Sequence, residues 1–482
     1  MPRSRARLMA VVALALLNVL IIAAGSVLAW QLPGRLALWK IPVVASRPLV
    51  RPAALLDGSG SGRLPTQAGL SARLSGLLAT PALGSHVAAV VGDPATGRVL
   101  FSRQGGSPAE PASTAKLATA VAALDVLGPG ARFTTRVVQD TAAPARGPAR
   151  ITLVGGGDPT LAAGRAAGSG YPRPATLAAL AAATARTLAG QHRKAARIGY
   201  DTSLYSGPLT APGWSPSYVT TGNVTPITAL AVDQGRLLPD GKPEDADDPV
   251  NLRPRSLTPS ADAASAFAGF LARDGVRVDG PPRAAGTPRK ATRVAAVSSP
   301  PLEAIVERML TESDNVIAEN LARQVALAKG APASFSGAAA AVTSVIRRLG
   351  AGPGVHLVDD SGLSPDDRIP AATLFRLVSL AASPGHPELR SVITGLPVAG
   401  FSGTLTKGRS VFGNPAGSRG VLWAKTGNLN TVVSLAGLVD DRNGSVLAFA
   451  FMADRLPSAR DLRPAASTVD KLAAALAGCG CR

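Results

Sequence analysis

Three short stretches decide how this chain folds and point to its chemistry: Ser113-Thr114-Ala115-Lys116, Ser313-Asp314-Asn315 and Lys425-Thr426-Gly427. In this order they read S-x-x-K, S-D-N and K-T-G, a set associated with a serine that attacks a peptide or β-lactam carbonyl. Each stretch alone is short enough to arise by chance. Together, in this order and each in a suitable local setting, they indicate an enzyme.

The first stretch is expected to begin a helix. Pro111 precedes it, and a strongly helix-forming run follows at Leu117 to Leu124. Ser113 is therefore expected at a helix start, where unpaired N–H groups and the helix dipole favour developing negative charge. Lys116 lies three residues on, over the same face, and burial there would lower its pKa so that it can accept the serine proton. The alternative is an ordinary N-cap serine followed by a solvated lysine.

The second stretch is expected between two helices. The pattern at Leu302 to Met309 is amphipathic, and Val316 to Ala322 continues at helical spacing beyond Asn315. Ser313, Asp314 and Asn315 then form a polar break that can present a hydroxyl and an amide to a cleft. The same residues also suit a helix N-cap, and the two roles are compatible.

The third stretch is expected on or beside an antiparallel sheet. The flanking sequence predicts a lead-in segment, a strand, a turn containing Asn-Gly and a second strand, at residues 421–424, 430–439, 441–444 and 445–452. Gly427 lets a ligand backbone approach closely, and Lys425 and Thr426 can meet a carboxylate. The alternative is a strand that merely contains a lysine and a glycine.

With these stretches and several others, the chain resembles the penicillin-binding D-alanyl-D-alanine carboxypeptidase/endopeptidase family, the low-molecular-mass class C whose catalytic domain carries a large insertion. The similar segments lie between about residues 70 and 478 and are Pro111 to Lys116, Gly155 to Leu161, Asp360 to Ser364, Leu396 to Gly400 and Gly403 to Leu405. A class A β-lactamase is similar in the three motifs. However, 196 residues separate Lys116 from Ser313, many more than in that class, and no suitable glutamate motif follows.

The resemblance implies a fold class and a domain organisation. We expect an α/β (α+β) fold, with a penicillin-binding or β-lactamase-like transpeptidase domain in which helices flank an antiparallel sheet. The catalytic domain is expected at residues 71–132 and 260–478, with an insertion at residues 133–259. The length of 482 residues also favours more than one module.

The resemblance further implies a mechanism of acyl transfer through a serine ester. Ser113 attacks the carbonyl between the two terminal D-alanines of a peptidoglycan stem peptide, and Lys116 acts as general base. Ser313 and Lys425 then relay the proton to the leaving D-alanine, and water releases the acyl group. β-Lactams are expected to acylate Ser113 and to leave slowly. No cofactor and no metal are expected.

The same resemblance assigns substrate contacts. Asn315 would bind the substrate amide, and Thr426 with Lys425 would hold the terminal carboxylate beside Gly427. The oxyanion would lie between the backbone N–H groups of Ser113 and Asn428. The family usually has threonine or serine where this chain has Asn428, so a side-chain hydroxyl contact is lost while the N–H remains.

Two other hypotheses concern function and the cysteines. A non-hydrolytic wall-binding scaffold is the alternative to an enzyme, and the intact Ser113 and Lys116 argue against it. Cys479 and Cys481 are expected either to form a disulfide or to stay reduced. Because they are one residue apart and no histidine cluster accompanies them, they do not predict a metal site.

The charge of the chain is strongly positive, with a formal net charge of +19. No dense basic run interleaved with aromatic residues occurs, so we expect no nucleic-acid partner. Arginines spread over a solvated surface are the simplest explanation, and attraction to anionic lipid or wall polymer is the alternative.

The amino end predicts export. Arg3, Arg5 and Arg7 precede an apolar stretch of 23 residues at Leu8 to Trp30, long enough to span a bilayer with the amino end cytoplasmic. A cleaved signal peptide with the cut after Ala29 is the alternative. Either way, residues 1–30 place the catalytic part outside the cytoplasm, anchored in the membrane or secreted. Residues 31–70, rich in Pro, Gly and Ser, are expected to be a flexible linker. The oligomeric state stays open.

Overall fold

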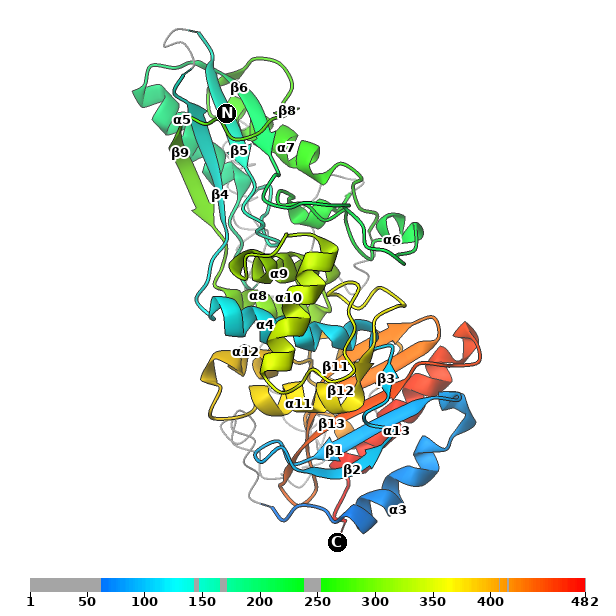
Figure 1. Ribbon diagram of the computed structural model, residues 1–482. Coiled ribbons are helices and arrows are strands. Elements are labelled where there is room, and N and C mark those ends of the chain that lie inside the picture. The colour runs from blue at the N-terminus through cyan, green and yellow to red at the C-terminus, as the bar shows by residue number, and fades with distance from the viewer. Residues whose placement is uncertain are drawn as a thin grey trace, which may run out of the picture. The chain divides into compact units, whose positions relative to one another are not determined.

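The computed structural model describes residues 62–142, 147–164, 171–237, 253–406, 408–413 and 416–481, which belong to one compact unit (Figure 1). These residues fold around two large sheets, one built from both ends of the described chain and one built from its middle. A two-stranded sheet pairs β3 Pro108–Ala109 with β10 Ile369–Pro370. The predicted membrane segment and most of the predicted linker, up to residue 61, lie outside the described residues. Among the described helices, none is long and apolar enough to cross a membrane.

The first sheet has five antiparallel strands in the order β11-β12-β13-β1-β2. Their bounds are β1 Val87–Gly92, β2 Val99–Arg103, β11 Leu422–Leu429, β12 Val432–Asp440 and β13 Val446–Ala453. The turn between β12 and β13 is closed by the Asp441 carboxylate, which accepts from the N–H groups of Asn443 and Ser445 at 2.8 Å each. This hairpin confirms the one predicted from the apolar runs.

Both faces of this sheet are covered by helices. One face carries α4 Lys116–Leu127, α8 Leu302–Glu312, α9 Asn315–Ala328, α10 Phe335–Arg348, α11 Ala371–Ala381 and α12 Arg390–Thr394. The other face carries α3 Gln67–Leu78 and α13 Leu462–Ala477 (Figure 1). Along β13 the side chains alternate between the two cores, with Ala448 and Ala450 in one and Phe449 and Phe451 in the other. The predicted mixed α/β fold with a helix-flanked antiparallel sheet is confirmed.

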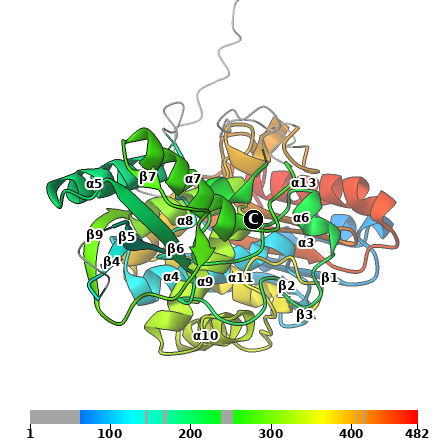
Figure 2. The same ribbon diagram turned by 90° about the horizontal axis from the view of Figure 1, so that it is seen from above.

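The second sheet lies in the inserted region, with the order β7-β6-β5-β4-β9 and β8 paired to β6. Its strands are β4 Thr134–Asp140, β5 Ala149–Val154, β6 Ala195–Asp201, β7 Arg277–Val278, β8 Arg283–Ala284 and β9 Ala291–Ser298. β5 and β6 are parallel and are connected through α5 Leu177–Gly190, which packs against α7 Pro259–Arg273 beside the sheet (Figure 2). A short helix, α6 Ser217–Thr220, lies in the segment that follows β6.

The predicted end of the insertion at residue 259 is wrong. The helix α7 lies almost entirely in the segment predicted to belong to the catalytic domain, but it packs its apolar side into the core of the inserted sheet. β9 then pairs antiparallel with β4 along nearly its whole length. The insertion therefore closes near Ser299, whose N–H donates to the Phe133 carbonyl at 2.9 Å, so that both ends of the insertion meet. The physical reason is that β4 is paired on both sides, and the strand that takes its second set of backbone hydrogen bonds comes late in the chain.

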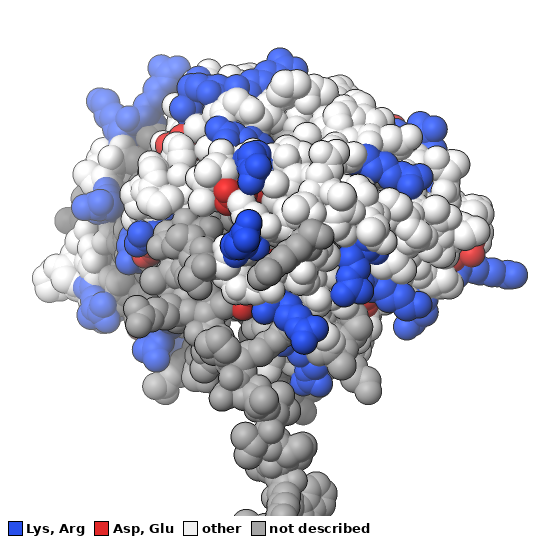
Figure 3. All heavy atoms as spheres, turned by 90° about the horizontal axis from the view of Figure 1, so that it is seen from below, with Lys and Arg blue, Asp and Glu red and all other residues white. Residues whose placement is uncertain are grey.

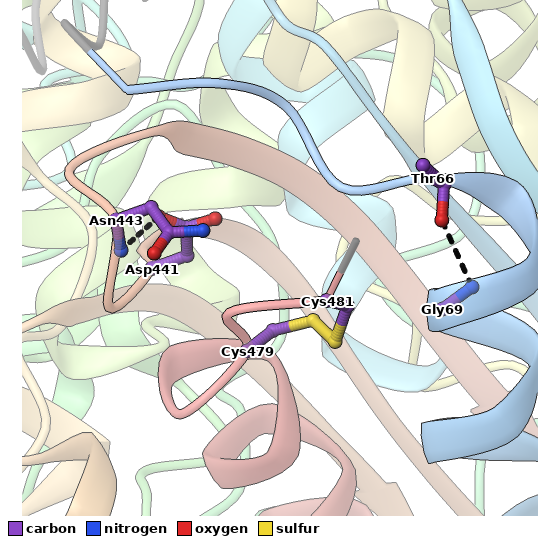
Figure 4. Close-up of a disulfide and its surroundings, with 6 residues drawn as sticks. All are labelled: Thr66, Gly69, Asp441, Asn443, Cys479 and Cys481. Atoms are coloured by element: carbon purple, nitrogen blue, oxygen red, sulfur yellow. Dashed lines mark hydrogen bonds between the residues drawn. A yellow bond between two sulfur atoms is a disulfide. The ribbon is translucent and has the colours of Figure 1, made fainter.

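The predicted linker also ends earlier than residue 70. Gly62 donates to the carbonyl of Gly444 and Thr66 donates to that of Cys481, each at 3.2 Å. Leu70 is fully buried. Cys479 and Cys481 form a disulfide, so the first of the two predicted alternatives holds, and Figure 4 shows this tail beside Thr66 and Gly69 at the start of α3. Residues 62–70 are thus part of the folded unit.

Positive charge is spread over one face of the molecule. The face shown in Figure 3 carries many separate lysine and arginine side chains and few aspartates or glutamates. They do not gather into a single run. This distribution agrees with the prediction of arginines dispersed over a solvated surface.

Replacing Leu70 with alanine tests the packing of α3. Because the side chain is fully buried, Leu70→Ala should lower the free energy of unfolding by about 2–5 kcal/mol, measured by urea denaturation. Arg73→Ala, on the exposed side of the same helix, is the control and should change it by less than about 0.5 kcal/mol. Equal stability of the two variants would contradict the packing described here.

Candidate active site

The first predicted stretch forms a turn of 3-10 helix, Ala112–Ala115, that runs directly into α4. Ser113 therefore lies at a helix start, as the sequence predicts. The turn is tied to the first sheet because the Pro111 carbonyl accepts from the Ser434 hydroxyl of β12 at 2.7 Å. Ala112 has a φ of 45°, a left-handed conformation that alanine adopts only when its surroundings impose it.

Lys116 is fully buried, and its side-chain nitrogen contacts three oxygen atoms. Nζ lies 3.0 Å from Ser113 Oγ, 2.6 Å from Asn315 Oδ1 and 2.6 Å from the carbonyl oxygen of Ser361. Burial lowers the pKa of Lys116 from 10.5 to about 8, against the opposing effect of nearby carboxylates, Asp359 foremost. The uncharged amine is therefore accessible near neutral pH.

These contacts give the uncharged amine a direction. A neutral lysine has two N–H groups and one lone pair, whereas the amide oxygen of Asn315 and the carbonyl of Ser361 can only accept. If each of them takes one N–H, the lone pair faces the third neighbour, Ser113 Oγ, which can donate its proton. The Asn315 amide is oriented by its Nδ2, which donates to the Asn223 carbonyl at 2.8 Å. This arrangement can deprotonate Ser113.

The second predicted stretch forms the junction between α8 and α9, as expected. Ser313 ends α8 in a left-handed conformation with a φ of 59°. Asp314 caps α9, because its carboxylate accepts from the N–H of Ile317 at 3.0 Å. Both predicted features are therefore present: Asp314 is the N-cap of α9, and the Ser313 hydroxyl is available for hydrogen bonding at the same junction.

The third predicted stretch lies in β11, the edge strand of the first sheet. Lys425 is fully buried, and its Nζ donates to Ser313 Oγ at 2.9 Å and to the Thr426 carbonyl at 2.8 Å. Burial and the positive charge of Lys116 hold the pKa of Lys425 well below its usual value. The Thr426 hydroxyl lies 2.7 Å from that of Thr404. Two serine–lysine pairs thus stand side by side.

Gly427 is the point where β11 touches the nucleophile turn. A Cβ atom at this position would lie 2.2 Å from Ser434 Oγ and 2.8 Å from the Pro111 carbonyl oxygen. A side chain of any size would push the turn that carries Ser113 away from the strand. The glycine is required here by close packing.

A cavity of ≈ 450 Å³ joins these elements. Five of the eight predicted site residues line it: Ser113, Ser313, Asn315, Thr426 and Asn428. Lys116 and Lys425 are hydrogen-bonded to the hydroxyls of Ser113 and Ser313, respectively, and these two hydroxyls connect the lysines to the cavity. The structure therefore brings the predicted site residues together from stretches more than a hundred residues apart.

Part of the cavity wall was missed by the sequence analysis, because it comes from the insertion: Tyr218, Gly222, Asn223, Arg236 and Arg255. Gln234 also donates to the Asp314 carboxylate. Burial alone would raise the pKa of Asp314, but the positive charges of Arg236 and Arg308 outweigh it and keep the pKa below the usual value. Asp314 is a charged residue within a motif that becomes buried, and this was the available signal that it needs a partner. No local pattern indicates which residues act as that partner.

The fold and the site together define an active-site-serine hydrolase with a helix–sheet–helix core and two serine–lysine pairs. The chain belongs to the D-Ala-D-Ala carboxypeptidase 3 (S13) family, whose family model matches residues 70–254 and 240–476.

Individual relatives agree with this family. The chain is 38% identical over 445 residues to carboxypeptidase Rv3627c of Mycobacterium tuberculosis, covering 92% of this chain and 91% of that protein. It is 30% identical over 483 residues to the D-alanyl-D-alanine carboxypeptidase of Actinomadura sp., covering 86% of each. The crystal structure of penicillin binding protein 4 (dacB) from Haemophilus influenzae resembles the fold with a TM-score of 0.63 and 21% identity, covering 81% of this chain and 94% of that one.

These comparisons confirm the predicted family and the predicted enzyme class, a serine-type D-Ala-D-Ala carboxypeptidase. The roles of single residues remain predictions and are taken up below.

Substitution of Gly427 tests the contact between β11 and the nucleophile turn. Because the added methyl group would displace Ser113, Gly427→Ala should slow labelling by a fluorescent penicillin by about tenfold or more. Gly76→Ala, in α3 where no atom lies within 4 Å of the added methyl group, is the control and should label like the parent protein. Unchanged labelling of Gly427→Ala would refute the close approach.

Proposed function

We propose that Ser113 is the nucleophile of this carboxypeptidase and that Lys116 is its general base. The observation that carries the proposal is the set of three contacts around Lys116 Nζ. Two neighbours can only accept hydrogen bonds, and the third is Ser113 Oγ at 3.0 Å. Ser113 would attack the carbonyl of the penultimate D-alanine of a stem peptide, and its proton would pass to Lys116.

The second pair, Ser313 and Lys425, is proposed to return the proton. Lys425 Nζ donates to Ser313 Oγ at 2.9 Å, and both Ser313 and Ser113 line the cavity. A hydroxyl held by a buried lysine can pass a proton to the nitrogen of the leaving D-alanine. Water would then hydrolyse the ester on Ser113.

The substrate contacts are proposed on the walls of the same cavity. Asn315 and Thr426 line it. The Asn315 amide is proposed to bind the substrate amide, and the Thr426 hydroxyl is proposed to bind the terminal carboxylate. Gly427 lies against the nucleophile turn, which supports the proposal that the N–H of the next residue, Asn428, shares the oxyanion with that of Ser113. The exposed Asn428 side chain replaces the hydroxyl that the family usually has there.

The partners follow from this activity. Peptidoglycan stem peptides that end in D-Ala-D-Ala are the proposed substrates, and β-lactams, which mimic them, are the proposed inhibitors. Peptidoglycan lies outside the cytoplasm, so the enzyme acts there. We further propose, from the sequence of residues 1–30 alone, that an N-terminal anchor holds it at the membrane.

A covalent label tests the nucleophile. Fluorescent penicillin should label the parent protein, and Ser113→Ala should carry no label because the hydroxyl that forms the ester is removed. Ser410→Ala, which removes a hydroxyl from the same cavity, is the matched control and should be labelled. Intact-mass spectrometry checks the adduct, and an adduct on Ser113→Ala would refute the assignment.

The pH dependence of acylation tests the base. Because burial lowers the pKa of Lys116 to about 8, the uncharged amine forms near that pH, far below the 10.5 of a solvated lysine. The acylation rate should rise about tenfold per pH unit up to about pH 8 and then level off. Lys116→Arg, which stays protonated, should be inactive across the range. A rate that keeps rising to pH 10 would contradict a lowered pKa.

A further inference from the structure

The insertion bonds to both segments that supply a hydrogen-bond acceptor to Lys116: the Asn223 carbonyl accepts from the Asn315 amide, and Trp214 donates to Asp359, two residues before Ser361. We propose that Trp214 and Asn223 of the insertion position Lys116 for proton transfer, Trp214 through the loop of Asp359 and Asn223 through the Asn315 amide. They are positioning residues and do not touch the reacting atoms. This inference rests on the proposed role of Lys116 as base.

The Asp359 carboxylate, which is fully buried, accepts most of the backbone hydrogen bonds donated by residues 360–364, and Glu319 accepts one more, from the N–H of Asp360 at 3.1 Å. Oδ1 accepts from the backbone N–H groups of Ser361 at 3.0 Å and Gly362 at 2.7 Å. Oδ2 accepts from the N–H of Ser364 at 2.7 Å and from Nε1 of Trp214 at 2.6 Å. Hydrogen bonds to a carboxylate are short and strong, so Trp214 fixes the carboxylate around which the loop folds.

This loop forms part of the surroundings of both Lys116 and Ser113. The Ser361 carbonyl accepts from Lys116 Nζ at 2.6 Å. Gly362 has a φ of 79°, and a Cβ there would lie 1.9 Å from the Ala112 carbonyl oxygen, so the loop packs directly on the nucleophile turn. A small shift of the loop would move one of the two acceptors that direct the Lys116 lone pair.

Trp214 is held in place independently of its N–H group. Its ring meets Phe335 of α10 edge to face, with centroids 5.2 Å apart and planes at 80°. A phenylalanine at position 214 retains an aromatic ring for this contact but has no donor for Asp359. Packing and hydrogen bonding can therefore be separated by substitution.

Asn223 acts on the other acceptor. Its backbone carbonyl accepts from Asn315 Nδ2 at 2.8 Å. Because a carbonyl can only accept, the amide nitrogen of Asn315 must face Asn223, and Oδ1 then faces Lys116 at 2.6 Å. Thus the insertion orients both acceptors, and with them the lone pair that faces Ser113.

The test measures acylation by a chromogenic cephalosporin, separating the maximal rate constant from the dissociation constant of the initial complex. Trp214→Phe should lower the maximal rate constant about tenfold, with a dissociation constant within about twofold of the parent value. Phe335→Leu is the matched control, because it weakens the ring packing and keeps the N–H. It should lower the melting temperature and leave the rate constant nearly unchanged.

Asp359→Asn tests the same hydrogen bond from the acceptor side. Each carboxylate oxygen of Asp359 accepts from two N–H groups, so the NH2 group of an asparagine would face two donors in either orientation. The double variant Trp214→Phe/Asp359→Asn should lose no more rate than Asp359→Asn alone, because Asp359→Asn already disturbs the carboxylate through which Trp214 acts. Parent-like acylation by Trp214→Phe, or multiplied losses in the double variant, would overturn the inference. If Trp214→Phe fails to fold, parent-like acylation by Asp359→Asn overturns it instead. These outcomes presuppose a parent protein that is acylated on Ser113, and failure of that acylation refutes the proposed function itself.

Discussion

The burial of Lys116 is the constraint on which the rest of the site depends. A lysine removed from water favours its uncharged form, and the lowered pKa of about 8 follows from that burial. Burial also costs free energy unless the polar nitrogen finds partners. The partners here are the Asn315 amide, the Ser361 carbonyl and the Ser113 hydroxyl, which come from three separate segments. One buried nitrogen therefore ties α4, α9 and the Asp359 loop together at the proposed catalytic site.

The first sheet supplies the second half of the site through its edge. β11 is an edge strand, and Gly427 allows it to lie against the nucleophile turn with no intervening side chain. Lys425, on the same strand, is buried and bonded to Ser313 at the junction of α8 and α9. Because β12 and β13 bury alternate side chains in the two cores, the strand that carries Lys425 is supported by both helical layers.

The insertion takes part in the site as well as extending the fold. Its sheet is completed when β9 pairs with β4. The segment between β6 and α7 extends to the cavity. Asn223 accepts from the Asn315 amide that holds Lys116, Trp214 donates to Asp359 at the start of the loop of Ser361, and Arg236 stabilises the charge of Asp314. The insertion and the catalytic motifs are therefore coupled by hydrogen bonds and charge, and the cavity shape belongs to both.

Elements whose cause is local could be predicted from the sequence. The helix start at Ser113, the junction at Ser313 and Asp314 and the β12–β13 hairpin follow from neighbouring residues, and the motifs identified the family. Tertiary structure alone decided where the insertion ends, that residues 62–70 pack on the folded unit, and that Trp214 and Asn223 face the lysine site. Those contacts join residues about a hundred or more positions apart. These contacts form because folding brings together hydrogen-bond donors and acceptors that would otherwise lack a partner. No local sequence pattern encodes which donor meets which acceptor.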